Sequence, residues 1–185
     1  VPSSQRTGER GSIAPGSRSD QVQVQWGYQM TSAMAVDTSE NLYLTDSMNH
    51  RIVKVTPEGE VSVFAGTGTA GFSGDGGPAA AAALNNPIGV AVDADGNVYI
   101  ADNFNHRIRM VAAGTGTIST VAGTGVNTFG GDGGPATAAD LNSPRSLAVD
   151  GDGNLYVSDF SNRRIRRIEA GTGLISTFAG TGVSG

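Results

Sequence analysis

Residues 90–123 read VAVDADGNVYIADNFNHRIRMVAAGTGTISTVAG, and close variants of this stretch occur on both sides of it. The earlier copy spans residues 33–66 and the later copy spans residues 147–180. The tripeptide AVD begins at Ala35, Ala91 and Ala148, so the period is 56 and then 57 residues. Self-similarity at such a period is typical of repeat architectures, in which each repeat packs against its neighbours.

Each copy predicts four short strands, rich in Val, Ile, Tyr and Phe and separated by Gly, Asp and Asn. In the middle copy we expect strands at residues 90–92, 98–101, 107–111 and 117–122. In the second of these, Val98 and Ile100 share one face and Tyr99 occupies the other. A sheet that is apolar on both faces needs cover on both sides, and stacked four-stranded sheets supply it. The pattern therefore predicts an all-β fold of the β-propeller type.

Three runs carry a family resemblance: DSMNHRI at residues 46–52, DNFNHRI at residues 102–108 and the variant DFSNRRI at residues 159–165. They resemble the signature of NHL repeats. The resemblance implies one propeller blade of four antiparallel strands per repeat and commonly six blades per ring, so three repeats would form half of such a ring. It does not imply an activity, because NHL-type propellers include protein-binding modules, RNA-binding modules, bacterial surface and sensor domains, and a few lyases.

We divide the chain into an N-terminal polar arm, residues 1–32, and three NHL repeats within residues 33–185. The repeats span residues 33–66, 86–123 and 143–180 and are joined by Gly-rich linkers. Within the arm, QVQVQW at residues 21–26 alternates strictly and predicts a half-buried extra strand. Its apolar face carries our candidate self-association residues, Val22, Val24 and Trp26.

The two linkers, residues 66–87 and 123–144, each contain GDGGP followed by an Ala-rich segment. We expect short helices at residues 79–84 and 136–141, on one common face of the stack, with Leu84 and Leu141 buried. The GDGG loops could hold a cation or an anion, but a turn with a helix cap is the interpretation that we favour.

An aspartate and an arginine recur at the same spacing in every repeat, and we interpret them as structural locks within or between blades, in which the guanidinium bonds a carboxylate and strand ends. The pairs are Asp46 with Arg51, Asp102 with Arg107, and Asp159 with Arg164. His50 and His106 occupy equivalent positions, but Arg163 replaces the third, so a three-histidine metal site cannot form there. The turns DADGN at residues 93–97 and DGDGN at residues 150–154 resemble the start of a calcium loop but lack its later ligands, which favours hairpin turns. We identify no catalytic, cofactor-binding or metal-binding residue.

The composition limits the partners and the cellular location. The net charge of −5 disfavours nucleic acid, although RRIRR at residues 163–167 is locally basic. The chain has no cysteine, and no apolar run approaches the ~18 residues of a membrane span. It begins at Val1 without an initiating Met, so we expect a processed product or a piece of something longer.

We therefore expect a non-catalytic structural or interaction protein that self-assembles through its blades and its arm, either by completing a ring or as a head-to-tail filament. Its partners would be copies of itself, with other proteins or glycans as further candidates. The expected location is extracellular or on a bacterial cell surface. The alternatives are a fragment of a longer NHL propeller that acts as a protein-binding, ligand-binding or sensor module, a lyase-like or lactonase-like propeller enzyme, and an RNA-binding NHL module.

Overall fold

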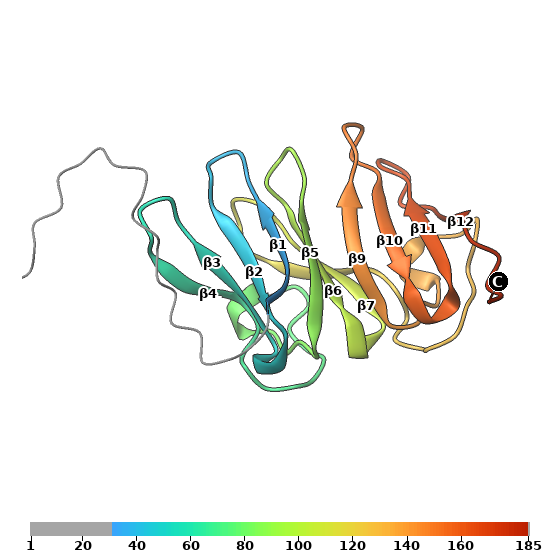
Figure 1. The fold of residues 1–185 in the computed structure, drawn as a ribbon, viewed down its shortest axis with the longest axis horizontal. Coiled ribbons are helices and arrows are strands. Elements are labelled where there is room, and N and C mark those ends of the chain that lie inside the picture. Colours follow the sequence, from blue (N-terminus) through green and yellow to red (C-terminus); the bar gives the residue numbers. More distant parts are fainter. Residues whose placement is uncertain (1–30, 185) are drawn as a thin grey trace, which may run out of the picture.

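The computed structural model describes residues 31–184, which form three antiparallel sheets of four strands each. The strands of each sheet lie in chain order, and each sheet is called a blade below. The predicted arm and its candidate residues Val22, Val24 and Trp26 lie outside the described residues. Figure 1 shows the blades side by side, with β5 between β1 and β9, so the all-β propeller-type prediction is confirmed.

The strand bounds repeat closely from blade to blade. Blade 1 contains β1 (Thr31–Val36), β2 (Leu42–Asp46), β3 (Arg51–Val55) and β4 (Val61–Ala65). Blade 2 contains β5 (Pro87–Val92), β6 (Val98–Asp102), β7 (Arg107–Val111) and β8 (Ile118–Ala122). Blade 3 contains β9 (Pro144–Val149), β10 (Leu155–Asp159), β11 (Arg164–Ile168) and β12 (Ile175–Ala179).

The turn between the first two strands of each blade is closed by an aspartate side chain. In blade 2, Asp93 Oδ1 accepts hydrogen bonds from the backbone N–H groups of Asp95 and Asn97, at 3.0 and 2.8 Å. Its Oδ2 accepts from Asn97 Nδ2 and from the Tyr99 hydroxyl, at 2.8 and 3.1 Å. Asp37 and Asp150 make the same set of contacts in the other blades. The carboxylate oxygens thus receive the loop's own donors, as in an Asx-type turn.

The second and third strands of each blade are joined by one 3-10 turn and a residue in the left-handed region. The turns are η1 (Ser47–Asn49), η3 (Asn103–Asn105) and η5 (Phe160–Asn162). His50, His106 and Arg163 follow them with φ of 51°, 53° and 52°. The two histidines accept hydrogen bonds at Nδ1 from the backbone N–H groups of Asn86 and Ser143, each at 3.1 Å. The turns of blades 1 and 2 therefore hold the start of the next blade.

The linkers contain less helix than predicted. Only η2 (Ala79–Ala81) and η4 (Ala136–Ala138) are helical, and each is a single 3-10 turn. Ala82 and Ala139 then return to extended backbone, which carries the fully buried Leu84 and Leu141 into the core. Gly66 and Gly123, which directly follow β4 and β8, donate to the carbonyls of Ala79 and Ala136. The two linkers are thus equivalent insertions at the same place in successive blades.

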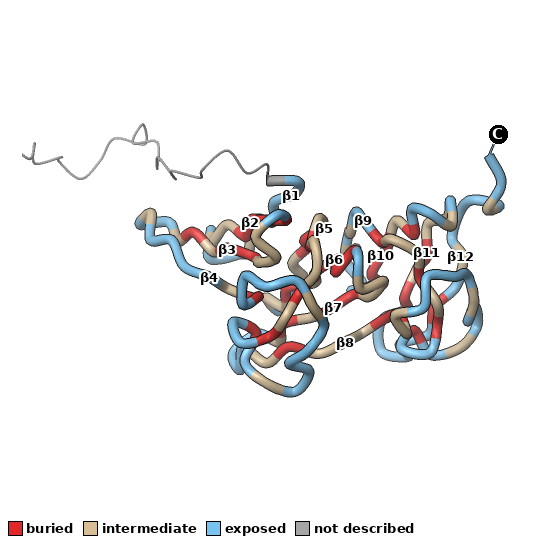
Figure 2. Tube along the Cα trace, turned by 90° about the horizontal axis from the view of Figure 1, so that it is seen from below, coloured by how far each residue is buried: buried red, intermediate tan, exposed pale blue. Residues whose placement is uncertain are grey.

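Two apolar cores lie between successive blades, and we call these contacts seams. At the first seam, Tyr43 and Ile52 of blade 1 pack with Val98 and Ile100 of blade 2, and Leu84 of the linker joins them. At the second seam, the opposite face of blade 2 packs with blade 3 through a second cluster of the same kind: Ala101, Ile108 and Ala122 meet Leu155, Val157 and Ile175. Figure 2 shows the buried residues on these strands and the exposed ones along β4, β12 and the linkers.

Candidate functional site

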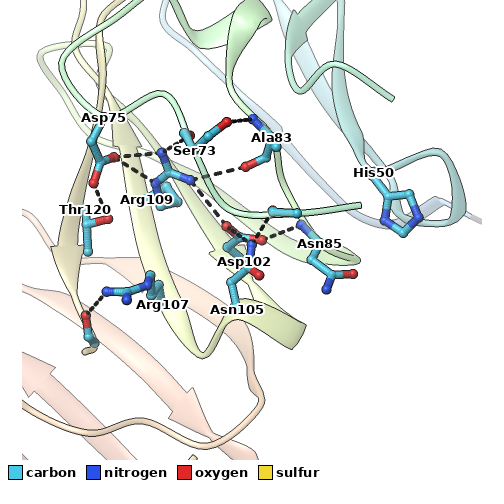
Figure 3. A network of polar contacts seen from close by, with 12 residues as sticks. His50, Ser73, Asp75, Ala83, Asn85, Asp102, Asn105, Arg107, Arg109 and Thr120 are labelled. Carbon is cyan, nitrogen blue, oxygen red and sulfur yellow. Dashed lines mark hydrogen bonds and ion pairs between the residues drawn. The ribbon is translucent and has the colours of Figure 1, made fainter. Parts of the chain in front are cut away.

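The most elaborate polar site in the described residues surrounds Arg109, a fully buried arginine on β7 (Figure 3). Its Nε and Nη2 atoms donate to Asp75 Oδ1 of the preceding linker, at 3.1 and 2.7 Å. Its Nη2 also donates to the carbonyl of Ser73, and its Nη1 lies 3.4 Å from Asp102 Oδ2. Thr120 of β8 donates to the second oxygen of Asp75 at 2.7 Å. The guanidinium therefore fastens the linker of one blade to the strands of the next, and we call this network the clasp.

Blade 3 contains a second clasp at the equivalent position. The fully buried Arg166 donates to Asp132 Oδ1 at 2.7 Å and to the carbonyl of Gly130 at 3.1 Å. It also lies 3.3 Å from Asp159 Oδ2, and Thr177 donates to Asp132 at 2.7 Å. A buried charge is tolerated where it is paired and hydrogen-bonded, and both arginines are paired with two aspartates. Arg109 donates from all three of its guanidinium nitrogens, whereas the buried Nε of Arg166 has no partner within residues 31–184.

An aromatic ring of the linker covers each clasp. The ring centroid of Phe72 lies 4.2 Å from the guanidinium carbon of Arg107 and 4.9 Å from that of Arg109. Phe129 lies in the same way over Arg164 and Arg166, at 3.8 and 4.8 Å. Stacked guanidinium groups are held in one orientation by such rings. The linker therefore contributes packing to the clasp as well as charge.

The predicted Asp–Arg locks are formed as written only in blade 1, where Arg51 Nε donates to Asp46 Oδ2 at 2.7 Å. In blades 2 and 3 the structure corrects the pairing. Arg107 instead donates to the carbonyls of Gly123 and Thr124, and Arg164 to those of Asn162 and Thr181. Asp102 and Asp159 pair with Arg109 and Arg166.

The reason for this difference is the residue two positions further along the third strand. Blade 1 carries Val53 there, whereas blades 2 and 3 carry Arg109 and Arg166 on the same strand face as the predicted arginine. The second arginine reaches the aspartate from inside the blade, which leaves Arg107 to bind carbonyls. Without a competitor, Arg51 bonds the aspartate itself.

The sequence-based interpretation also missed the role of the GDGG loops. No side chain caps η2 or η4, so Asp75 and Asp132 are not helix caps; they bind the buried arginines of the following blade. A signal for this existed in the sequence. The motif GDGGP precedes only the two repeats that contain Arg-Ile-Arg on their third strand. The joint occurrence of the acid and the second arginine indicates that they are partners.

The stability of the fold should depend on pH through Asp102. Burial raises the pKa of Asp102 from 3.8 to about 6, against the opposing effects of its bonds to Asn105, Asn85 and Arg109. A carboxyl whose pKa is raised on folding binds more protons in the folded state, so its contribution is present below pH 3.8 and is lost as the pH rises through 6. Asp37 and Asp132, whose pKa is lowered on folding, have the opposite effect on stability. Their stabilising contribution is lost as the pH falls below 3.8.

We therefore expect the free energy of unfolding of the wild-type protein to fall between about pH 4 and pH 6, relative to an Asp102→Asn variant. Urea unfolding at a series of pH values measures this difference. Asp150→Asn is the control. The pKa of the Asp150 carboxyl is lowered, so the free energy of unfolding of the wild type relative to Asp150→Asn should not fall between pH 4 and pH 6. A difference between wild type and Asp102→Asn that stays constant from pH 4 to pH 7 would contradict the assignment.

The described residues contain no group of three or more His, Cys, Asp or Glu placed to hold a metal ion. Burial lowers the pKa of His106, whose Nδ1 accepts the hydrogen bond from Ser143. No helix within residues 31–184 is long and apolar enough to cross a membrane.

The outer faces of the first and last blades form the second notable surface. On blade 1, four apolar side chains of β1 and β4 are 43–65% exposed: Met34, Val36, Val61 and Val63. On blade 3, Phe178 of β12 is 62% exposed and meets Tyr156 edge to face, with ring centroids 5.1 Å apart. No other blade of the described residues packs on either face. We call these the head face, on blade 1, and the tail face, on blade 3.

Comparison with known proteins agrees with this architecture, which is that of propeller blades built from tandem repeats. Residues 69–130 and 125–183 match the family model of the teneurin NHL domain. These matches cover more than half of the chain, which therefore belongs to the NHL-repeat family. Human Teneurin-4 is 39% identical over 109 residues, which represent 52% of this chain and 4% of that protein. The Arabidopsis thaliana protein SUPPRESSOR OF QUENCHING 1, chloroplastic, is 35% identical over 102 residues, 55% of this chain and 10% of that protein.

Solved structures show the same fold. A Bacteroides thetaiotaomicron protein of unknown function superposes with a TM-score of 0.61 at 32% identity, covering 69% of this chain and 32% of that one. Virginiamycin B lyase from Staphylococcus aureus superposes with a TM-score of 0.52 at 15% identity, covering 81% of this chain and 41% of that one. At that identity the likeness concerns the fold alone. The chain spans less than half the length of each of these proteins.

Proposed function

We propose that this protein is a non-catalytic interaction module that associates with copies of itself, head face to tail face. The observation that carries the proposal is the equivalence between these faces and the two faces of blade 2. The polar side chains of the repeats support a structural role, because the buried aspartates and arginines and both histidines bond neighbouring segments of the stack.

The head face corresponds to the face of blade 2 that packs at the first seam. Met34 and Val36 stand where Val90 and Val92 stand, since both pairs lie opposite equivalent residues of the second strand. The tail face corresponds to the other face of blade 2, which packs at the second seam. Tyr156 and Phe178 stand where Tyr99 and Val121 stand, and both of those residues belong to the second core. A tail face placed on a head face would therefore reproduce an internal seam.

The energetics favour such a contact. Full burial of a large apolar side chain is worth about 1.5–3 kcal/mol; four such side chains are exposed on the head face, and Phe178 is exposed on the tail face beside the half-buried Tyr156. Because the two faces differ, the contact is heterologous; two chains would close a ring if the rotation fits, and otherwise a filament would grow. Copies of the chain are thus the proposed partner, and an extracellular or cell-surface location belongs to the same proposal.

Charged substitutions on one face at a time test the proposal. Phe178→Asp on the tail face and Val36→Asp on the head face should each abolish self-association in sedimentation velocity. An equimolar mixture should form a dimer and stop there, because one intact tail and one intact head remain between the two chains. Phe104→Asp is the control, since Phe104 is 59% exposed in the turn η3 of blade 2. Dimers that persist in both single variants would refute the head-to-tail arrangement.

A second candidate function is a binding module within a longer single-chain propeller. The coverage of the solved structures favours it, because this chain matches 32% and 41% of two such proteins. In that case further blades of the same chain would cover the head and tail faces. The mixing experiment separates the two candidates, because a chain of only these residues would then remain monomeric.

A further inference from the structure

The residue of the third strand that lies opposite the second-strand tyrosine differs in charge among the three blades. It is Lys54 in blade 1, opposite Tyr43; Met110 in blade 2, opposite Tyr99; and Arg167 in blade 3, opposite Tyr156. All three side chains point to the face of their blade that is directed toward the next blade or, for Arg167, to the tail face. The identity of this residue can therefore affect what docks there.

The two internal seams show what this position meets. At the first seam, Lys54, Tyr43 and Phe64 border one groove together with residues 111–116, which end the third strand of blade 2 and turn toward its fourth. At the second seam, Met110, Tyr99 and Val121 border an equivalent groove of about 530 Å³ together with residues 168–173 of blade 3. The side chain thus faces the last turn of the next blade at both seams.

The internal seams place no like charges together at this point. Lys54 meets the uncharged run Ala112, Ala113, Gly114, Thr115 and Gly116. Met110 is uncharged and meets a turn that contains Glu169. At each internal seam the third-strand residue of one blade borders the last turn of the next blade. Among the described residues, no turn of a further blade lies beside Arg167 on the tail face, and no such third-strand residue lies beside the turn of blade 1 at residues 56–60. That turn reads Thr-Pro-Glu-Gly-Glu, and Glu58 and Glu60 are both exposed.

The contacts of Arg167 within its own blade are weak. Its nearest carboxylate oxygen is Glu169 Oε1, 4.0 Å from Nη2, at the limit of an ion pair. Its Nε is buried but has no hydrogen-bond partner within residues 31–184. A docked tail face would place this guanidinium beside the acidic turn of a second copy, where opposite charges attract and select the partner.

Blade 1 can also pack against a neighbour that supplies no linker aspartate for a clasp. Val53 stands where Arg109 and Arg166 stand, so the head face contains no buried guanidinium that needs an aspartate from a preceding linker. A second copy that presents its tail face therefore leaves no uncompensated buried charge on blade 1.

We propose that Arg167 of one copy pairs with the acidic turn Glu58–Gly59–Glu60 of the next. This ion pair favours docking of the tail face of one copy on the head face of another. The inference rests on the self-association proposed above. It adds a charge-specific site and predicts which end of the chain recognises which. The pair lies at the rim of an apolar contact, so it acts mainly on specificity and on the rate of association.

Charge reversal tests the pairing, with self-association measured by analytical ultracentrifugation. Arg167→Glu alone, and Glu58→Lys with Glu60→Lys alone, should each weaken self-association roughly tenfold or more, because like charges then face each other. An equimolar mixture of the two variants should recover association, since both of its seams again join opposite charges. Asp95→Lys with Asp152→Lys is the control; it makes the same change in charge on exposed turns of blades 2 and 3 and should have no effect.

The outcomes separate this inference from the function on which it rests. A wild-type chain that stays monomeric overturns both. A wild-type chain that associates, with reversed variants that associate equally well or a mixture that does not recover, overturns the pairing and leaves self-association in place. Should Arg167→Glu fail to fold, Arg167→Met supplies the residue that blade 2 carries at this position; it should fold and associate several-fold more weakly than the wild type.

Discussion

Replacement of Arg109 by alanine should lower the free energy of unfolding by about 3–5 kcal/mol, because it removes one member of a buried and fully bonded charge network. Asp102 would lose its guanidinium partner in the core, Asp75 would lose its ion pair, and Phe72 would lose part of its stacking partner. Urea unfolding monitored by circular dichroism measures the change.

Arg107→Ala is the matched control for this substitution. Arg107 is only partly buried and donates to the carbonyls of Gly123 and Thr124, so its loss should cost about 1 kcal/mol. Arg109→Val would reproduce blade 1, where Val53 leaves the aspartate to the first arginine of the strand, and a crystal structure should then show Arg107 bonded to Asp102. Equal costs for Arg107→Ala and Arg109→Ala would contradict the assignment of the clasp.

Gly89→Ala should also destabilise the protein strongly, by about 3 kcal/mol. A Cβ atom at Gly89 would overlap the backbone carbonyl oxygen of Arg145 and lie 3.1 Å from the Cβ of Ala101. Because the obstructing atom belongs to the backbone of β9, no side-chain rotation can relieve the overlap. The adjacent strands β5 and β9 would have to separate, and the second seam would open.

Gly151→Ala provides the control for Gly89→Ala. Gly151 lies in an exposed turn, its φ is not positive, and a Cβ there would meet nothing within 4 Å. Its substitution should leave the midpoint of thermal unfolding unchanged or slightly raised. A drop in the Gly89→Ala midpoint no larger than that of Gly151→Ala would show that blades 2 and 3 are farther apart than described.

The repeat pattern was sufficient to predict the four strands of each blade and the burial of Leu84 and Leu141. These features follow from alternation and turn residues, which are local properties of the sequence. The extent of the linker helices was overestimated, because the Ala-rich run has high helix propensity while its backbone is needed elsewhere. The carbonyls of Ala82 and Leu84 accept from Thr67 and Gly71, which holds these residues extended.

The partners within the polar site could not be predicted by spacing alone. Asp102 lies directly opposite Arg107 across β6 and β7, which made that pair the natural choice. The actual partner of Asp102 depends on a third residue, Arg109, and on the linker that closes over it. Which arginine pairs with the aspartate depends on which one reaches it in the folded structure. The spacing of two residues within one repeat does not contain that information.

The mass of the native particle tests the central claim most directly. Sedimentation equilibrium of the purified chain across a range of protein concentrations should give a particle of two or more copies, and association should weaken on dilution. Two half-rings that close would give twice the 18.7 kDa chain mass, and a filament would give a broad distribution of larger masses. A single species of 18.7 kDa at every concentration would contradict the account.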